Sequence, residues 1–293
     1  MKLTLLNMLL IMTSNALVIL VILLILTGVL CILMYKTVEN FKLVSPTVDS
    51  VKKEIPLVVH QVYTQGFEEI PECVRQVMKR NQKSNPDYEF RLYDMGQMKE
   101  YLQKKTTPIL LETFNLINPT CHACIADLFR YVVIYYEGGI YLDIKTEINT
   151  PLRDWVNNDI HLSMWPWFTH STLEKYYPND FVFKTKNREL NQSVLMYPPK
   201  HPVLAMVIDK VVRNIQNSHI NNDSKQHVLE ITGPHVYTEV IANNIKRFDF
   251  IVHQSNDVMF DGHIIYDGTK GEYHKNLKKQ GNSWQQNTEK KIL

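Results

Sequence analysis

The sequence lacks any strong excess of charge of one sign. Its 293 residues carry 32 Lys and Arg against 30 Asp and Glu, a formal net charge of +2. No basic helix or stripe with interleaved aromatic residues is present, so nucleic acid is not expected as a partner. Internal repeats and low-complexity tracts are also missing. The length then suits one α/β domain better than two independent ones.

Cysteine is scarce, with four residues in the chain. Cys31 lies in an apolar N-terminal run, Cys73 stands alone, and Cys121 and Cys124 form a Cys-x-x-Cys pattern. A structural zinc site needs four ligands, and only Cys73 and His122 are obvious additions to that pair. We therefore interpret Cys121 and Cys124 as two small residues on a buried helix face. A redox pair and a zinc site remain as alternatives.

A long uncharged run, from Ala16 to Tyr35, dominates the N-terminal part. Twenty helical residues span about 30 Å, the thickness of the hydrocarbon core of a bilayer. The run is too long for the apolar core of a cleaved signal peptide. We predict an N-terminal segment, 1–35, whose residues 16–35 form a single-pass membrane anchor. A polar stem, 36–54, and a catalytic or binding domain, 55–293, would follow.

The start of the domain has the rhythm of a parallel sheet. Residues 55–63 form an apolar, β-rich run of strand length, and residues 72–81 follow as a helix with Pro71 at its first turn. Residues 88–93 alternate between apolar and polar and predict a half-buried strand. Strand, helix and strand in this order indicate an α/β fold with parallel strands.

Residues 121–150 contain the most informative pattern. A buried helix is predicted up to Glu137, where Gly138 and Gly139 end it. A strand over 140–145 should follow. Its period of two places Ile140, Leu142 and Ile144 on one face and Tyr141, Asp143 and Lys145 on the other.

The polar residues of this segment can meet in one pocket. Asp127 and Arg130 are three apart on the helix and share a side. Together with Tyr141, Asp143 and Lys145 of the strand, they form a charged constellation within one short stretch of chain. The alternative is a surface ion pair beside an ordinary strand end. Apolar residues on the opposite faces of both elements favour the pocket.

The run from Ala126 to Asp143 resembles the signature of glycosyltransferase family 32, whose members carry a DxD motif. The segments 55–61, 85–88 and 232–234, and the late His274 with Ser283 and Trp284, resemble other elements of that family. The resemblance extends over most of the chain from Ile55 to Trp284.

This resemblance implies a GT-A fold, a Rossmann-like sheet with one nucleotide-sugar site. It implies retaining transfer of a hexose to a glycan or glycolipid acceptor, and the family's mannosyltransferases make mannose a candidate. It also implies a domain in a lumenal, Golgi- or ER-like compartment, although Lys residues after the apolar run favour the cytoplasm under the positive-inside rule. The donor-binding residues carried over from the family are His60, Gln61, Asp127, Arg130, Tyr141, Asp143, Ser283 and Trp284. Asn191 is a candidate for facing the acceptor.

One position departs from the family pattern. The second Asp of DxD, normally a ligand of Mn or Mg, is replaced by Lys145. A metal could be held by Asp143 with His274 or Glu147, or Lys145 could supply the positive charge itself, with Asp143, Lys145 and Arg130 as the catalytic residues. The third possibility is a catalytically silent, membrane-anchored protein that binds a nucleotide sugar or glycan.

Overall fold

A computed structural model describes residues 24–29, 54–165, 189–221, 228–254 and 258–279. The chain divides into two units, Met1–Leu43 and Val44–Leu293, which are described separately. In the first unit, residues 24–29 are helical. The rest of the predicted span, 16–23 and 30–35, lies outside the described residues. Within the described ranges, no helix is both long enough and apolar enough to cross a bilayer.

The second unit is built on a four-stranded sheet. Its strands are β1 (Val58–Val62), β2 (Glu89–Tyr93), β3 (Gly139–Leu142) and β7 (Val194–Tyr197), in the order β2-β1-β3-β7. β1 pairs in parallel with β2 and with β3, and β7 runs antiparallel to β3. The predicted strand–helix–strand unit is confirmed, with α2 (Glu72–Ser84) connecting β1 to β2. The α/β class is therefore correct.

Two smaller sheets flank this one. The first joins β4 (Glu147–Ile148), β10 (Ile264–Ile265) and β9 (Val258–Met259), all antiparallel. The second joins β6 (Glu189–Leu190), β5 (His161–Trp165) and β8 (Ile251–Gln254). Short 3-10 turns lie at Phe67–Glu69 and Leu152–Asp154. Through β4 and β10, the segment that follows β3 is tied to the C-terminal part of the chain.

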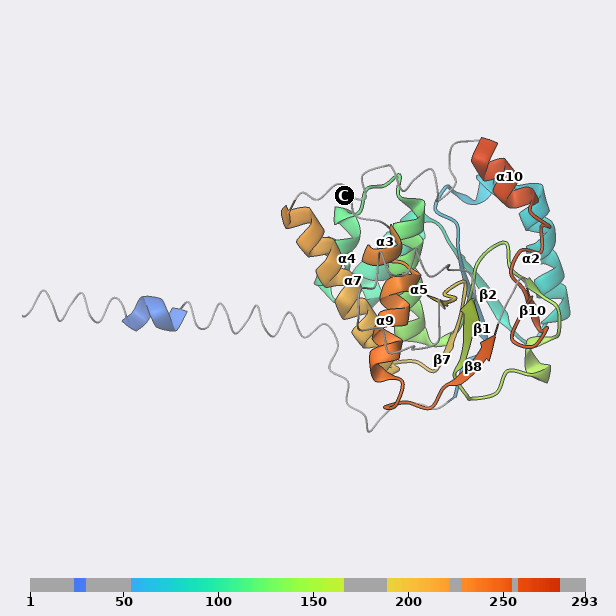
Figure 1. Cartoon of the computed structure of the whole chain (residues 1–293). Coiled ribbons are helices and arrows are strands. Elements are labelled where there is room, and N and C mark those ends of the chain that lie inside the picture. Colours follow the sequence, from blue (N-terminus) through green and yellow to red (C-terminus); the bar gives the residue numbers. More distant parts are fainter. Residues whose placement is uncertain (1–23, 30–53, 166–188, 222–227, 255–257, 280–293) are drawn as a thin grey trace, which may run out of the picture. The chain divides into compact units, whose positions relative to one another are not determined.

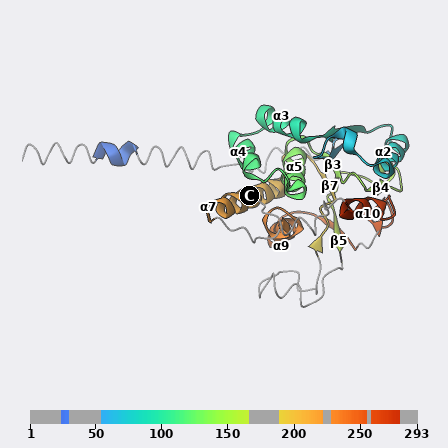
Figure 2. The same ribbon diagram turned by 90° about the horizontal axis from the view of Figure 1, so that it is seen from above.

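Helices lie on both sides of the central sheet (Figure 1). One group contains α3 (Met95–Lys105), α4 (Pro108–Leu116), α5 (His122–Glu137), α7 (Pro202–Asn221), α8 (Val228–Ile231) and α9 (Pro234–Asn244). The other group contains α2 and α10 (Glu272–Lys279), which pack together. Seen from above in Figure 2, α2 and α10 again lie apart from α7 and α9.

Helix α5 is the most buried of the helices that the structure describes in full. It ends where the sequence predicts, because Gly138 and Gly139 adopt φ angles of 69° and 92°. A Cβ atom on Gly138 would approach Pro199 to 2.6 Å, and one on Gly139 would approach Val58 equally closely, at 2.6 Å. Glycine is therefore required for the chain to turn from α5 directly into β3.

The predicted strand over 140–145 is too long. β3 ends at Leu142, and a turn follows in which the Thr146 N–H donates to the Asp143 carbonyl at 2.8 Å. Ile140 and Leu142 pack together in the main core as expected. Ile144 does not share their face. Because it lies in the turn, it packs in a second hydrophobic cluster with Tyr63 and Val74.

Candidate active site

A cavity of about 810 Å³ opens at the carboxyl ends of β1 and β3. The chain leaves β1 toward β2 on one side, while β3 lies on the other side, so this is a topological switch point of the sheet. Ligands of open α/β sheets bind at such points. The cavity is lined by Asp127, Arg130, Tyr141, Asp143, Lys145, Asn191 and His274, among others. Seven of the predicted site residues therefore share one cavity.

Asp143 is the centre of the charged network. Its Oδ1 accepts a hydrogen bond from the Tyr141 hydroxyl at 3.0 Å and lies 3.4 Å from the Arg130 guanidinium. Its Oδ2 accepts a hydrogen bond from Lys145 Nζ at 3.0 Å. Burial by itself would raise the pKa of Asp143, but Lys145 and Arg130 hold that pKa below its ordinary value. Asp143 is thus a carboxylate held between two cations.

Lys145 points into the cavity, as predicted, but for a different reason. It lies in the turn after β3 rather than on the strand, and strand alternation therefore does not orient it. Its carbonyl accepts from Gly268 N–H at 2.9 Å, and its Nζ lies 4.0 Å from the centre of the Tyr266 ring. The next residue is fixed by Asn81 Nδ2, which donates to the Thr146 carbonyl at 2.8 Å. The lysine is therefore anchored by its backbone and its side chain.

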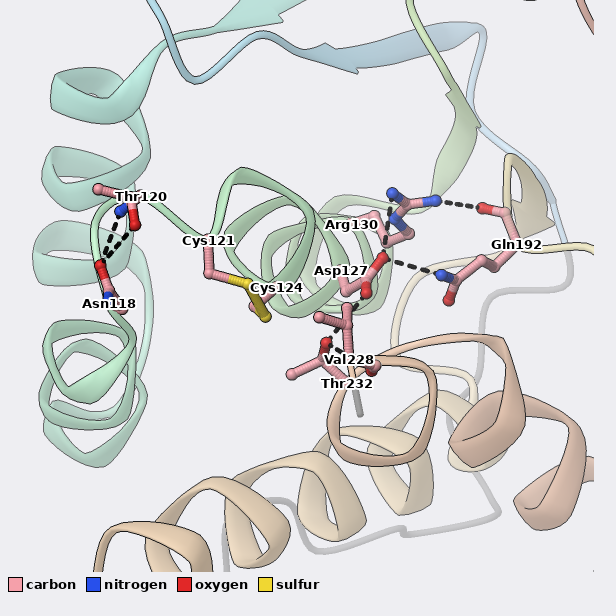
Figure 3. The surroundings of a disulfide bond; sticks show 9 residues. All are labelled: Asn118, Thr120, Cys121, Cys124, Asp127, Arg130, Gln192, Val228 and Thr232. Atoms are coloured by element: carbon pink, nitrogen blue, oxygen red, sulfur yellow. Dashed lines mark hydrogen bonds and ion pairs between the residues drawn. A yellow bond between two sulfur atoms is a disulfide. The ribbon is translucent and has the colours of Figure 1, made fainter. Parts of the chain in front are cut away.

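Asp127 and Arg130 form a buried pair on α5 (Figure 3), with Arg130 Nη2 3.2 Å from Asp127 Oδ1. Gln192 Nε2 donates to Asp127 Oδ1 at 2.8 Å, and the Thr232 hydroxyl donates to Oδ2 at 2.9 Å. Arg130 also donates to the Gln192 carbonyl at 2.8 Å and stacks over the Tyr141 ring. Burial raises the pKa of Asp127 to about 6, against the opposing effects of Arg130 and Thr232.

Sequence periodicity does not identify the partners Gln192, Thr232 and Tyr266. They come from segments far along the chain, and spacing along one element reports only neighbours on that element. Only the family resemblance points to Thr232, as the first residue of the Thr-Gly-Pro segment. No sequence pattern points to Tyr266.

His60 and Gln61 are both fully buried, and neither lines the cavity. His60 bonds through its two ring nitrogens to the Tyr93 hydroxyl at 3.1 Å and the Gly138 carbonyl at 3.2 Å. Burial, together with nearby Arg91, lowers the pKa of His60 to about 4. The part of this segment that lines the cavity comes next in the chain, from Val62 to Gln65.

The remaining predicted site residues have different surroundings. Both polar atoms of the Asn191 side chain are engaged within the protein, with Nδ2 donating to Met259 Sδ and Oδ1 accepting from Ser193 N–H. His274 Nε2 lies 3.7 Å from Asp267 Oδ2, and its ring stacks on Tyr266. Ser283 and Trp284 lie outside the described residues.

The interpretation of Cys121 and Cys124 as two separate small residues is wrong. They form a disulfide at the start of α5 (Figure 3). Cys121 caps the helix and Cys124 lies in its first turn, and the two Cα atoms are 5.4 Å apart. That separation is within the range that disulfides require. The bond lies one turn before Asp127, and neither cysteine lines the cavity.

The comparisons with known proteins concern the segment of chain that forms much of this site. The family of glycosyltransferases with a sugar-binding region containing a DXD motif matches residues 71–161, which include the segment from Asp127 to Lys145. Over this segment the chain is similar to this family of glycosyltransferases, and fungal mannosyltransferases are among its relatives.

Two relatives illustrate the range of the family. An uncharacterized glycosyltransferase of Acanthamoeba polyphaga mimivirus is 25% identical over 66% of this chain and 67% of its own length. Inositol phosphoceramide mannosyltransferase 3 of Schizosaccharomyces pombe is 25% identical over 55% of this chain. The match covers 42% of that fungal enzyme, less than half of its length. A solved structure titled PaToxG glycosyltransferase covers 74% of this chain and 78% of its own, with 18% identity and a TM-score of 0.46.

The divalent cation implied by the DXD motif does not fit the described residues of this glycosyltransferase. Lys145 occupies the position of the second carboxylate, and both oxygens of Asp143 already face cations. Glu147 pairs with Arg80 Nε at 2.6 Å and Nη2 at 3.1 Å and does not line the cavity that contains Asp143. Across the described part of the chain, no cluster of three or more His, Cys, Asp or Glu is suited to a metal.

Proposed function

We propose that this glycosyltransferase transfers a hexose from a nucleotide sugar to a glycan or glycolipid acceptor with retention of the anomeric configuration. The observation that carries the proposal is the position of Asp143. This carboxylate lies in a cavity at the switch point of a mixed sheet, between Arg130 and Lys145. The GT-A assignment and the retaining stereochemistry rest on the family resemblance.

The size of the cavity suits a donor with part of an acceptor. Ligand pockets commonly have volumes of roughly 300–1,000 Å³, and this one measures about 810 Å³. Polar and charged groups gather around Asp143, whereas Ile144, Val228 and Leu277 supply apolar lining. Such a site can hold a diphosphate at one place and pack a base or sugar ring at another.

The reaction breaks the bond between the sugar C1 and the phosphate oxygen of the donor. The electron pair of that bond stays on the leaving nucleoside diphosphate, which gains negative charge. A hydroxyl oxygen of the acceptor forms the new bond to C1, and its proton passes to a phosphate oxygen of the leaving group. Groups that stabilise the diphosphate as its charge grows lower the barrier.

The described residues suit separate roles in this reaction. Arg130 and Lys145 would stabilise the diphosphate by charge, and Asp143 would accept hydrogen bonds from hydroxyls of the transferred sugar. Asp127 would hold Arg130 in place and bind ribose or sugar hydroxyls. Tyr141 would line the donor pocket. We keep Asn191 as a proposed acceptor-side residue because it lines the same cavity.

Mannose is the hexose that the names of the fungal relatives favour, since three of them are mannosyltransferases. The test is to incubate the full chain in detergent with GDP-mannose, UDP-glucose and UDP-galactose, each with methyl α-mannoside or inositol phosphoceramide. We expect nucleoside diphosphate release that depends on one acceptor, and a product with the donor's anomeric configuration by NMR. A product with the inverted configuration would contradict the retaining mechanism.

A catalytically silent binding protein gives a different result in the same experiment. It would bind a nucleotide sugar in a titration but release no nucleoside diphosphate with any acceptor. The names of the relatives, which are glycosyltransferases and mannosyltransferases, favour the active enzyme.

We also propose that residues 16–35 anchor the chain in a membrane and that the domain 55–293 faces a lumenal compartment. The support is the uncharged run in the sequence together with the family resemblance. Alkaline carbonate should leave the full chain in the membrane fraction, and protease added to intact vesicles should spare the domain. Release by carbonate would refute the anchor, and digestion without detergent would refute the lumenal orientation.

A further inference from the structure

Lys145 is the position where this chain departs most clearly from its family's DXD motif. The side chain that replaces a metal-binding carboxylate is itself a cation, and its exposed fraction is 6%. An ammonium at that place repels a divalent ion rather than binding it. What the lysine can do instead depends on how it is held.

Three groups hold the Lys145 ammonium in the cavity. Asp143 Oδ2 accepts its hydrogen bond at 3.0 Å, and the Tyr266 ring lies beneath it with 4.0 Å between Nζ and the ring centre. The backbone of the same turn is bonded to Gly268 and, through Thr146, to Asn81 and the Tyr266 carbonyl. An ammonium fixed in this way needs little reorganisation to act on a ligand.

Two cations converge on the Asp143 carboxylate and can turn toward a diphosphate. Lys145 and Arg130 both lie within 3.4 Å of the Asp143 carboxylate, from the turn after β3 and from α5. Asp143 neutralises one of the two positive charges, and Asp127 is bonded to Arg130 as well as to Gln192 and Thr232. Lys270 and Lys278 also line this cavity. Glu189 and Asp267 line it too, so acidic and basic residues are equal in number, and the positive charge is local to the Lys145 ammonium and the Arg130 guanidinium.

We propose that the Lys145 ammonium takes the place of the divalent cation in this glycosyltransferase, so that binding of the donor diphosphate does not require a metal. This inference rests on the proposed function. Lys145 contacts the diphosphate oxygens and stabilises the electron pair left on them when the C1–O bond breaks. It remains protonated throughout and donates no proton to the reaction.

A titration of the wild-type protein with UDP and with GDP tests this without any mutation. Each nucleotide is measured by calorimetry once in EDTA and once in Mn²⁺. We expect at least one of them to bind with affinities that agree within about twofold in the two conditions. Binding that appears only with Mn²⁺ overturns the inference and leaves the proposed function standing. If neither nucleotide binds in either condition, the proposed function fails, and the inference fails with it.

Variants of Lys145 give a second, independent readout. Lys145→Met keeps the length of the side chain but removes the charge, and we expect it to weaken nucleotide binding in EDTA at least about tenfold. Lys145→Arg should recover most of that loss. Lys145→Asp restores two carboxylates and should bind the nucleotide in Mn²⁺ but not in EDTA.

The matched control is Lys104→Met, which removes a lysine from the exposed surface of α3, where its partner is Glu100. It should bind the nucleotide as the wild type does. Thermal melts of all variants separate loss of folding from loss of binding, and the wild-type titration decides the matter if Lys145→Met does not fold. A folded Lys145→Met protein that binds the nucleotide with unchanged affinity in EDTA would overturn the inference.

Discussion

Two groups of residues meet around the Asp127–Arg130–Asp143 network, and they differ in chemistry and in their place along the chain. The motif wall consists of Asp127, Arg130, Tyr141, Asp143 and Lys145, and it contains all the charges of the network around Asp143. The C-terminal supports are Gln192, Thr232 and Tyr266, which are uncharged and contact the motif wall.

This difference indicates a division of labour. The motif wall supplies groups that can act on a ligand, and the C-terminal supports fix the positions and pKa values of those groups. Changes in the motif wall should therefore abolish turnover. Changes in the C-terminal supports should reduce it or shift its pH dependence, because the charged groups remain.

The largest effect is expected from Asp143→Asn, which removes the carboxylate between Arg130 and Lys145. Turnover should fall by about 100-fold or more, because groups aimed at the reacting centre contribute on that scale. Assays of nucleoside diphosphate release, with circular dichroism as a check of folding, measure this. Asp87→Asn is the control, since Asp87 pairs with Arg153 on the surface. Activity within a few-fold of the wild type would remove Asp143 from the catalytic centre.

The second effect is on pH dependence. The pKa of Asp127 is raised to about 6, so its charge and its ion pair with Arg130 are lost as the pH falls through about 6. Activity should decline in that range. Thr232→Val removes a hydrogen bond to the charged carboxylate, which raises this pKa further and moves the decline to higher pH. A pH profile of kcat/KM that is identical in the two proteins would show that Thr232 does not tune Asp127.

A smaller effect is expected from Tyr266→Leu, which removes the ring beneath Lys145. Cation–π contacts contribute about 0.5–2 kcal/mol, so nucleotide binding should weaken by about 2- to 30-fold. Tyr266→Phe keeps the ring and should retain most of the affinity. Calorimetric titrations with UDP and GDP compare the two variants. An equal loss of affinity in both would assign the effect to the Tyr266 hydroxyl instead of its ring.

The smallest effect on function is expected at the disulfide, which belongs to neither group. The double variant Cys121→Ser with Cys124→Ser should lower the free energy of unfolding by about 2 kcal/mol, the value for so short a loop. Nucleotide binding should change by no more than about twofold, because neither cysteine lines the cavity. Urea unfolding and titration measure both quantities, with Cys73→Ser as the control. A large loss of binding would mean that the disulfide positions Asp127.

The sequence predicts the motif wall well because its residues follow one another along a helix, a turn and a strand. Helical spacing places Asp127 beside Arg130, and the glycine pair predicts the turn into β3. The same reasoning extends the strand too far, because the alternation of apolar and polar residues continues past Leu142 and does not predict the turn at Asp143. The prediction that Lys145 lies in the same pocket as Asp143 is therefore correct, although it assumes a strand where the chain forms a turn.

The C-terminal supports could not be found in that way. Gln192 lies just before β7 and Tyr266 just after β10, so their contacts with the motif wall depend on how these strands pair. A single sequence does not reveal such long-range pairing. Sequence reasoning misses the Cys121–Cys124 bond for another reason. The spacing Cys-x-x-Cys fits a helix face and a disulfide equally well, and only the geometry of the first turn of α5 separates them.

The most direct test of the whole account is a crystal structure of the chain with a nucleoside diphosphate, UDP or GDP, bound in the presence of EDTA. We predict a diphosphate within hydrogen-bonding distance of Lys145 Nζ and the Arg130 guanidinium, at the carboxyl ends of β1 and β3. A nucleotide bound elsewhere on the domain, with the cavity around Asp143 empty, would contradict it.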